Sequence, residues 1–221
     1  MKIRKLSQKA FDYQAERQYY GKHAVVLQDF SYIEPYFRAF LGDYCAYFDG
    51  KRVLDIGAGE CVHGRQVCTA CNPQLYVNLD LFSDRMLPVA QHNVFKQMHF
   101  ISGDCFSLPF HENSFDVVWG NGVLFRLRPL DKVVAEISRV LRPGGSYLGM
   151  EPNFLNPLVF LKFMLTSRDN GNDGALLHGT TKNAFLRAGL NLEFKFFWKK
   201  LPWLRNSVLS TSMGLIAHKP A

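Results

Sequence analysis

Short apolar runs alternate with helical segments between residues 52 and 150, and this alternation constrains the fold more than any other feature of the chain. The runs predict strands over 52–56, 75–79, 98–102, 115–119 and 146–150. Helices are expected between them, where apolar residues recur at helical spacing, over 63–69, 84–95 and 130–141, with Pro88 in a first turn. Strands that alternate with helices form a parallel sheet with helices on both faces. The expected core is a doubly wound α/β sheet.

The segments on either side of this core carry different patterns. Residues 7–48 hold aromatic residues at helical spacing and predict two or three helices before the first strand. After the core, residues 182–188 predict a helix, and 191–198 and 208–218 predict two consecutive strands, which suggest an antiparallel pair at one edge. We therefore expect a seven-stranded, mostly parallel sheet with an antiparallel C-terminal edge strand and an N-terminal helical addition.

The composition is that of a folded globular protein. The 221 residues are 48% hydrophobic and 20% charged, which argues against a disordered or coiled-coil chain, and this length favours a single domain. Lys and Arg number 26 against 19 Asp and Glu, for a net charge of +7. This excess favours anionic partners, but no block of like charges marks a nucleic-acid-binding tail. No nucleic-acid partner is expected.

The cysteines and the apolar stretches indicate the cellular compartment in which the protein is expected. The five cysteines are Cys45, Cys61, Cys68, Cys71 and Cys105, an odd set without a disulfide-like pattern. The start of the chain lacks the apolar core of a signal peptide, so a reducing cytoplasm is expected. The apolar stretch 158–165 is interrupted by Lys162 and is too short to span a bilayer. Cys61, Cys68 and Cys71 lie near His63 in the sequence, but their spacing is not that of a zinc site, so no metal is expected.

Residues that follow the strands form the candidate binding site, because ligands of doubly wound sheets bind beyond the carboxyl ends of the strands. Asp55 and the turn Gly57-Ala58-Gly59 close the first strand, and glycine lets the backbone turn tightly and approach a ligand. Asp80 follows the second strand, where a carboxylate can accept hydrogen bonds from both ribose hydroxyls. A dinucleotide fingerprint would need glycine in place of Val62, which disfavours an NAD(P) oxidoreductase. A nucleoside without a pyrophosphate fits better.

Five segments in register are similar to the motifs of class I S-adenosylmethionine-dependent methyltransferases, of the small-molecule, methyltransferase-11-like type. They are VLDIGAGE at 53–60, NLD at 78–80, GDCFSLPF at 103–110, NSFDVVWGNGVLF at 113–125 and RVLRPGG at 139–145. Together they cover roughly residues 51–151, about half of the chain, and five motifs are far more specific than one. The resemblance implies a Rossmann-like fold, the cofactor S-adenosyl-L-methionine and the product S-adenosyl-L-homocysteine.

The resemblance also implies roles for individual residues. The cofactor-binding residues that it implies are Asp55, Gly57, Ala58, Gly59, Asp80, Leu81, Asp104, Cys105 and Asn121. The glycines would run beneath the methionine part, and Asp80 would hold the ribose. Asp104, with the backbone of Cys105, would recognise adenine, and Asn121 would lie by the methionine part. A carboxylate can accept from the adenine amino group, so the assignment is chemically reasonable.

Two departures from the family pattern bear on the turn and on catalysis. Cys61 replaces the third glycine of the first motif. This change bears on the local geometry of the turn and does not affect the assignment of the rest of the site. Phe125-Arg126 stands where a histidine pair is often found after the fourth strand, so no ready base exists there. Transfer from a sulfonium needs mainly alignment of an in-line nucleophile, with a base if the acceptor is a hydroxyl.

The candidate bases are Glu151, directly after the fifth strand, and His178, in a glycine-flanked loop before the helix at 182–188. Each has a structural alternative. Glu151 could orient the loop that follows it, and His178 could be a hydrogen-bonded loop residue. His63 and His111 are expected at the surface.

The domain plan is a single methyltransferase domain over 1–221. Its parts are a helical N-terminal cap at 1–50, a cofactor-binding core at 51–151, a substrate-shaping insertion at 152–181, and a C-terminal helix with edge strands at 182–221. In the insertion, Phe154, Leu158, Leu161 and Leu165 recur at helical spacing, and residues 198–203 combine aromatic and basic side chains. Core packing against the N-terminal helices is the plainer interpretation of both segments. A lipid-like acceptor or transient contact with a membrane surface is the other.

The leading functional hypothesis is methylation of a small molecule, on an oxygen of a sugar, a lipid-linked glycan or a secondary metabolite. One alternative is methylation of a quinone or another membrane-associated lipid. Another is a partner subunit that binds S-adenosylmethionine without catalysis, which the absent histidine pair would permit.

Overall fold

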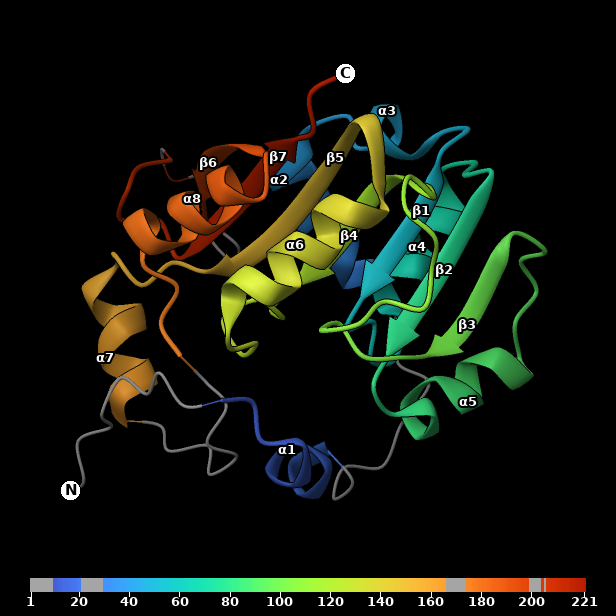
Figure 1. Ribbon diagram of the computed structural model, residues 1–221, viewed down its shortest axis with the longest axis horizontal. Helices are drawn as coiled ribbons and strands as arrows, with labels where there is room; N and C mark the ends of the chain where they lie inside the picture. Colours follow the sequence, from blue (N-terminus) through green and yellow to red (C-terminus); the bar gives the residue numbers. More distant parts are fainter. Residues whose placement is uncertain (1–9, 21–29, 166–173, 199–203, 205) are drawn as a thin grey trace.

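A seven-stranded sheet forms the centre of the protein in the computed structural model, which describes residues 10–20, 30–165, 174–198, 204 and 206–221 (Figure 1). The strands are β1 (Arg52–Ile56), β2 (Leu75–Asp80), β3 (Met98–Ser102), β4 (Phe115–Asn121), β5 (Leu141–Pro152), β6 (Asn191–Phe197) and β7 (Ser212–His218). Their order in the sheet is β3-β2-β1-β4-β5-β7-β6. Strands β1 to β5 are parallel, and β7 pairs antiparallel with β5 and with β6. The doubly wound α/β prediction is confirmed.

The helices form a layer on each face of the sheet. They are α1 (Tyr13–Tyr20), a 3-10 turn at Ser31–Ile33, α2 (Glu34–Leu41), α3 (Cys45–Phe48), α4 (Val62–Ala70), α5 (Ser83–Gln91), α6 (Leu130–Val140), α7 (Pro157–Leu165) and α8 (His178–Arg187). Buried residues of α2 to α5 pack on one face, and those of α6 and α8 pack on the other. Helix α1 lies off the ends of the strands to which the arrowheads point, and α7 lies beyond the end of β5 (Figure 1). Among the described residues, no helix has the length and apolar character needed to cross a membrane.

The layer that contains α6 follows directly from sequence periodicity. Val133, Val134 and Ile137 of this helix are all fully buried, and they recur at the spacing that places side chains on one helical face. Asp131 in the first turn and Arg139 in the last turn complement the helix dipole. Full burial of each side chain contributes about 1.5–3 kcal/mol, so α6 is firmly attached to the sheet.

The layer on the opposite face is built around aromatic rings. Trp119 of β4 is fully buried, and its ring centroid lies 4.7 Å from that of Phe37 and 6.1 Å from that of Phe48. His63 of α4 lies 5.6 Å from the same ring and is buried, so its expected surface position is wrong. Its place in the first turn of α4, against the sheet, is a consequence of tertiary packing. His111 is exposed, as expected.

Several element boundaries differ from those expected. Helix α5 begins at Ser83 and ends at Gln91, so Pro88 lies inside the helix and not in its first turn. Helix α8 begins four residues earlier than expected, which makes His178 its first residue and not a loop residue. The last strand begins at Ser212. The aromatic and basic segment at 199–203 lies outside the described residues.

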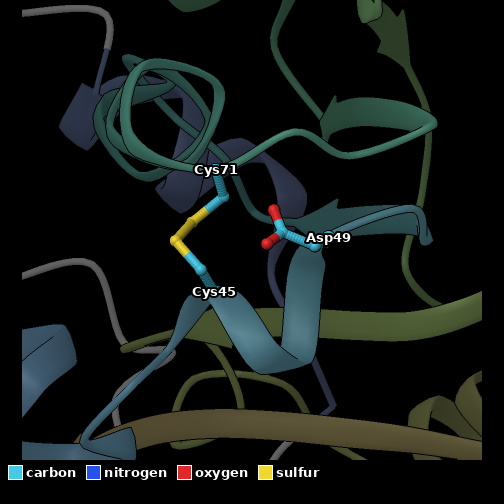
Figure 2. A group of neighbouring side chains, drawn as sticks. All are labelled: Cys45, Asp49 and Cys71. Carbon is cyan, nitrogen blue, oxygen red and sulfur yellow. A yellow bond between two sulfur atoms is a disulfide. The ribbon is translucent and has the colours of Figure 1, made fainter.

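A disulfide joins Cys45 at the start of α3 to Cys71 at the end of α4 (Figure 2). The expectation of no disulfide pattern is therefore wrong, and the cysteines no longer argue for a reducing compartment. The two residues are 26 apart in sequence, and only the packing of α3 beside α4 brings their Cα atoms to 5.3 Å. Asp49 lies beside the bond, where its Oδ1 accepts a hydrogen bond from the Asn72 amide at 2.7 Å.

Candidate active site

A cavity of about 300 Å³ opens at the carboxyl ends of β1 to β4. All but one of the cofactor residues implied by the sequence line it, namely Gly57, Ala58, Gly59, Asp80, Leu81, Asp104, Cys105 and Asn121. They come from four strands that are neighbours in the order β3-β2-β1-β4, so the sheet itself brings these distant residues together. The position agrees with the general rule for doubly wound sheets.

Asp55 is the exception, because it lies beneath the turn and is not part of the cavity wall. It is buried, and the Tyr76 hydroxyl donates a hydrogen bond to its Oδ2 at 3.0 Å. Burial raises the pKa of Asp55 well above its ordinary value, an effect that the Tyr76 hydrogen bond opposes. Asp55 therefore ties β1 to β2 under the turn.

The turn after β1 depends on backbone conformations that favour glycine. Gly57 has a φ of +66°, and a Cβ built there would lie 2.6 Å from Cγ2 of Val123, so no larger residue fits. Cys61, which replaces the family's third glycine, adopts the left-handed conformation with a φ of +54°. This conformation costs a non-glycine residue about 1 kcal/mol. The chain keeps the turn despite the substitution.

Asp80 is held in place by backbone amides on the cavity wall. Its Oδ2 accepts from the Gly59 amide at 2.8 Å, and its Oδ1 accepts from the Phe82 amide at 3.0 Å. An ionised carboxylate has about four acceptor positions, so these two bonds leave capacity for ligand hydroxyls. The carboxylate is oriented before any ligand arrives.

Asp104 lies past β3 and is contacted from the N-terminal helix. Its Oδ1 accepts from the Phe106 amide at 2.8 Å, and the Tyr13 hydroxyl of α1 donates to its Oδ2 at 2.7 Å. Partial burial, and then the hydrogen bond to Asp104, raise the pKa of Tyr13 to about 12. The hydroxyl therefore stays protonated and acts as a donor at neutral pH.

The cavity residues that the sequence reasoning missed include four that interact with one another. They are Glu16 and Tyr20 of α1, Arg85 of α5, and Arg126 in the loop after β4. Nη2 of Arg126 lies 2.9 Å from Oε1 and 3.0 Å from Oε2 of Glu16, in an ion pair that is largely buried. The Tyr20 ring centroid lies 4.2 Å from Cζ of Arg85 and 5.0 Å from Cζ of Arg126. The one available signal was Arg126 itself, which replaces part of the family's histidine pair.

Glu151 lies within β5 and is buried outside the cavity wall. Its Oε1 accepts from the amides of Val123 at 3.2 Å and Leu124 at 2.9 Å. Burial raises the pKa of Glu151 to about 7, although these amides and Arg128 lower it. The carboxylate thus holds the loop that brings Val123 against Gly57, and not the loop after its own strand.

His178 also lies outside the cavity wall. Its ring centroid is 4.5 Å from that of Phe194 and 5.3 Å from that of Phe196, both on β6. Partial burial lowers its pKa below the ordinary value, which favours the neutral imidazole. Its catalytic role stays a prediction, as does that of Glu151.

Relatives of known description match the same part of the chain. Residues 54–149 match the family described as a methyltransferase domain. A fatty-acid O-methyltransferase of Mycolicibacterium smegmatis is 33% identical over 100 residues, which are 45% of this chain and 36% of that protein. A sterol 24-C-methyltransferase of Schizosaccharomyces pombe is 36% identical over 101 residues, which are 44% of this chain and 27% of that protein. The matched segment thus spans about a third of the length of these relatives.

The fold has relatives that extend beyond this segment. An S-adenosylmethionine-dependent methyltransferase from Mesorhizobium loti superposes with a TM-score of 0.66 over 86% of this chain and 98% of that one, at 16% identity. This likeness shows the Rossmann-like fold. Residues 54–149 thus match a methyltransferase domain, in agreement with the resemblance drawn from the sequence.

Proposed function

We propose that this protein binds S-adenosylmethionine in the cavity at the ends of β1 to β4 and transfers its methyl group to a small molecule. The observation that carries the proposal is the convergence of Asp80, Asp104 and the Gly57 turn on one cavity. Asp80 would accept from the ribose hydroxyls, and Asp104 from the adenine amino group. Gly57 lines the cavity, and its missing Cβ lets Val123 pack against the turn.

The bound sulfonium supplies an activated methyl group, so the protein has mainly to align it with the acceptor atom. The Gly57 turn and the loop after β4 wall the cavity beside β1 and β4, and Glu151 holds that loop by accepting two amide hydrogen bonds. Alignment of this kind can supply a large part of a methyl-transfer rate enhancement. Val123 and Leu124 of that loop are buried, and Val123 lines the cavity.

Calorimetric titration with S-adenosylmethionine, S-adenosylhomocysteine and NAD tests the cofactor directly. We expect micromolar affinity for the first two, about 8 kcal/mol, and no binding of NAD. Binding of NAD alone would overturn the proposal. Binding of none of the three would indicate a domain that kept the fold for another purpose.

The two candidate bases are tested by Glu151→Gln and His178→Ala. If either group removes a proton from the acceptor, its variant keeps cofactor affinity and loses about 10²–10⁴-fold in kcat. If a variant keeps both its cofactor affinity and its kcat, the substituted residue has no catalytic role. If the acceptor needs no base, we expect both variants to retain methyl transfer.

For the acceptor, the observed surface favours a lipid over the sugar, glycan or secondary metabolite that the sequence suggested. Helix α7 has no buried residue, and Leu158, Leu161 and Leu165 are 76%, 52% and 51% exposed. The expectation that these leucines pack into the core is therefore wrong. The helix packs instead through its opposite side, which includes Phe160 and Phe163.

This leucine stripe, Leu158, Leu161 and Leu165, fits a membrane surface. Lys162 is exposed beside it and is the only charged residue of α7. A leucine face with a basic residue, on a chain of net charge +7, suits an anionic lipid surface. The named relatives include enzymes described by fatty-acid and sterol substrates. We therefore propose a lipid acceptor reached from a bilayer.

Flotation with phosphatidylcholine vesicles that contain phosphatidylglycerol tests the stripe. We expect Leu161→Glu to abolish vesicle binding, while the matched control Leu87→Glu on α5, at a residue 55% exposed, retains it. Equal binding by both variants would exclude α7 as the contact. Cofactor affinity should be unchanged in both, which separates this result from the cofactor proposal.

A further inference from the structure

The ion pair between Glu16 and Arg126 joins α1 to the loop after β4 inside the cavity. Both side chains are more than nine-tenths buried, at 9% and 8% exposure. Both line the cavity together with Asn121, at the end of β4. The pair thus presents one negative and one positive group to the same enclosed space.

The position of the pair along the sheet edge indicates which part of a bound nucleoside would reach it. Asp104 follows β3 and Asp80 ends β2, whereas Arg126 follows β4, and the sheet order places β1 between β2 and β4. Neighbouring strands lie about 4.8 Å apart, so the step from β2 to β4 is about 10 Å. A nucleoside whose base and ribose bind Asp104 and Asp80 would therefore extend past the Gly57 turn toward Arg126.

Fold stability alone gives a weak reason for burying this pair. Removal of two charges from water costs several kcal/mol for each ion, and their attraction often only offsets that cost. A ligand that carries both charges changes the balance, because each buried charge then gains a second partner of opposite sign.

We propose that Glu16 and Arg126 together recognise the amino-acid end of the nucleoside, with Arg126 binding its α-carboxylate and Glu16 its α-ammonium group. The inference rests on the proposed function and deepens it by assigning the methionine end of the cofactor to α1 and the loop after β4. These residues select a nucleoside that carries a zwitterionic amino acid over one that lacks it. They bind the cofactor and take no part in the bond changes.

The test compares two nucleosides that differ in the amino-acid end. S-adenosylhomocysteine carries the amino acid, and 5′-deoxy-5′-methylthioadenosine lacks it. We expect the wild-type protein to prefer S-adenosylhomocysteine, and Arg126→Gln and Glu16→Gln each to weaken that ligand about 10- to 100-fold, the range for charged hydrogen bonds. Affinity for the methylthio nucleoside should change less than twofold. Calorimetry measures both.

The control is the exposed ion pair between Asp131 and Arg187, tested as Arg187→Gln, which should leave both affinities unchanged. If Arg126→Gln and Glu16→Gln weaken both nucleosides equally, the pair only anchors α1 and the inference is overturned. If both variants bind S-adenosylhomocysteine like the wild type, the inference is also overturned. Failure of the wild-type protein to bind either nucleoside would instead overturn the proposed function itself.

Discussion

The two ends of the carboxyl edge of the sheet are built differently. At β3, β2, β1 and β4, the polar side chains point into one cavity, and backbone amides fix the carboxylate of Asp80 before a ligand binds. Beyond β5, the exposed side chains include the leucines of α7, while Glu151 is enclosed and His178 stacks on Phe196 of β6. The comparison teaches that one end of this edge presents groups suited to binding a polar ligand, whereas the other end, where we propose that the acceptor binds, presents an apolar surface.

Helices α6 and α7 show the same difference in their packing. Ile137 of α6 is fully buried, whereas Leu161 of α7 is 52% exposed. We expect Ile137→Ala to lower the free energy of unfolding by about 4 kcal/mol, because it leaves a cavity in the core. Leu161→Ala should change it by about 0.5 kcal/mol or less. Urea denaturation measures both, and similar losses would contradict the exposed position of α7.

Glu151 should make the fold less stable as the pH rises. Its pKa is about 7 in the folded protein, against an ordinary value near 4.5, because burial penalises the charged form. Between these pH values the unfolded chain releases a proton that the folded protein keeps, so the unfolding free energy falls by about 3 kcal/mol from pH 4.5 to pH 7. Denaturation at pH 5 and pH 8 should show a fall that is about 3 kcal/mol larger in the wild type than in Glu151→Gln, in which the buried Asp55 still contributes a fall of the same sign. Parallel pH dependence in the two proteins would refute the assignment.

Asp80 tests the cofactor end. Asp80→Ala removes charge-assisted acceptors for the ribose, and we expect it to weaken binding of S-adenosylmethionine by about 2 kcal/mol, roughly 30-fold. Calorimetry measures the affinity, and Asp131→Ala, at an exposed carboxylate, serves as the control. Unchanged affinity in Asp80→Ala would remove the ribose assignment.

Lys162 tests the acceptor end with a smaller effect. A basic residue near an anionic bilayer contributes about 1 kcal/mol, so Lys162→Ala should weaken binding to phosphatidylglycerol vesicles about fivefold. Neutral phosphatidylcholine vesicles should not distinguish the variant from the wild type. Equal losses on both kinds of vesicle would mean that charge takes no part in the contact.

The fold and the residues that line the cavity at the strand ends could be predicted well from the sequence because their signals are local. A strand, its glycine turn and the acidic residue after the next strand are each visible in a few consecutive residues, and the doubly wound topology then brings them together. The turn at Cys61 kept its left-handed conformation although the glycine was replaced. The exact start of α8, and with it the position of His178, could not be read from the sequence, because propensity fixes helix ends poorly.

Other features required contacts between segments far apart in the chain. The disulfide between Cys45 and Cys71 follows from the packing of α3 beside α4, and no spacing rule indicated it. The apolar spacing of α7 predicts a helix, but the same spacing suits a buried face or an exposed one. Only the neighbours of the helix decide which of the two is realised.

The sequence by itself determined the alternation of strands and helices, the class of cofactor, and the acidic and glycine residues at the strand ends, because each depends on local propensity and on residue type. Tertiary structure alone decided that Glu16 and Arg126 meet across 110 residues, that Glu151 supports the loop after β4, and that the leucines of α7 face outward. Those outcomes depend on which surfaces exclude water from one another, and that is a property of the packed chain rather than of any segment of it.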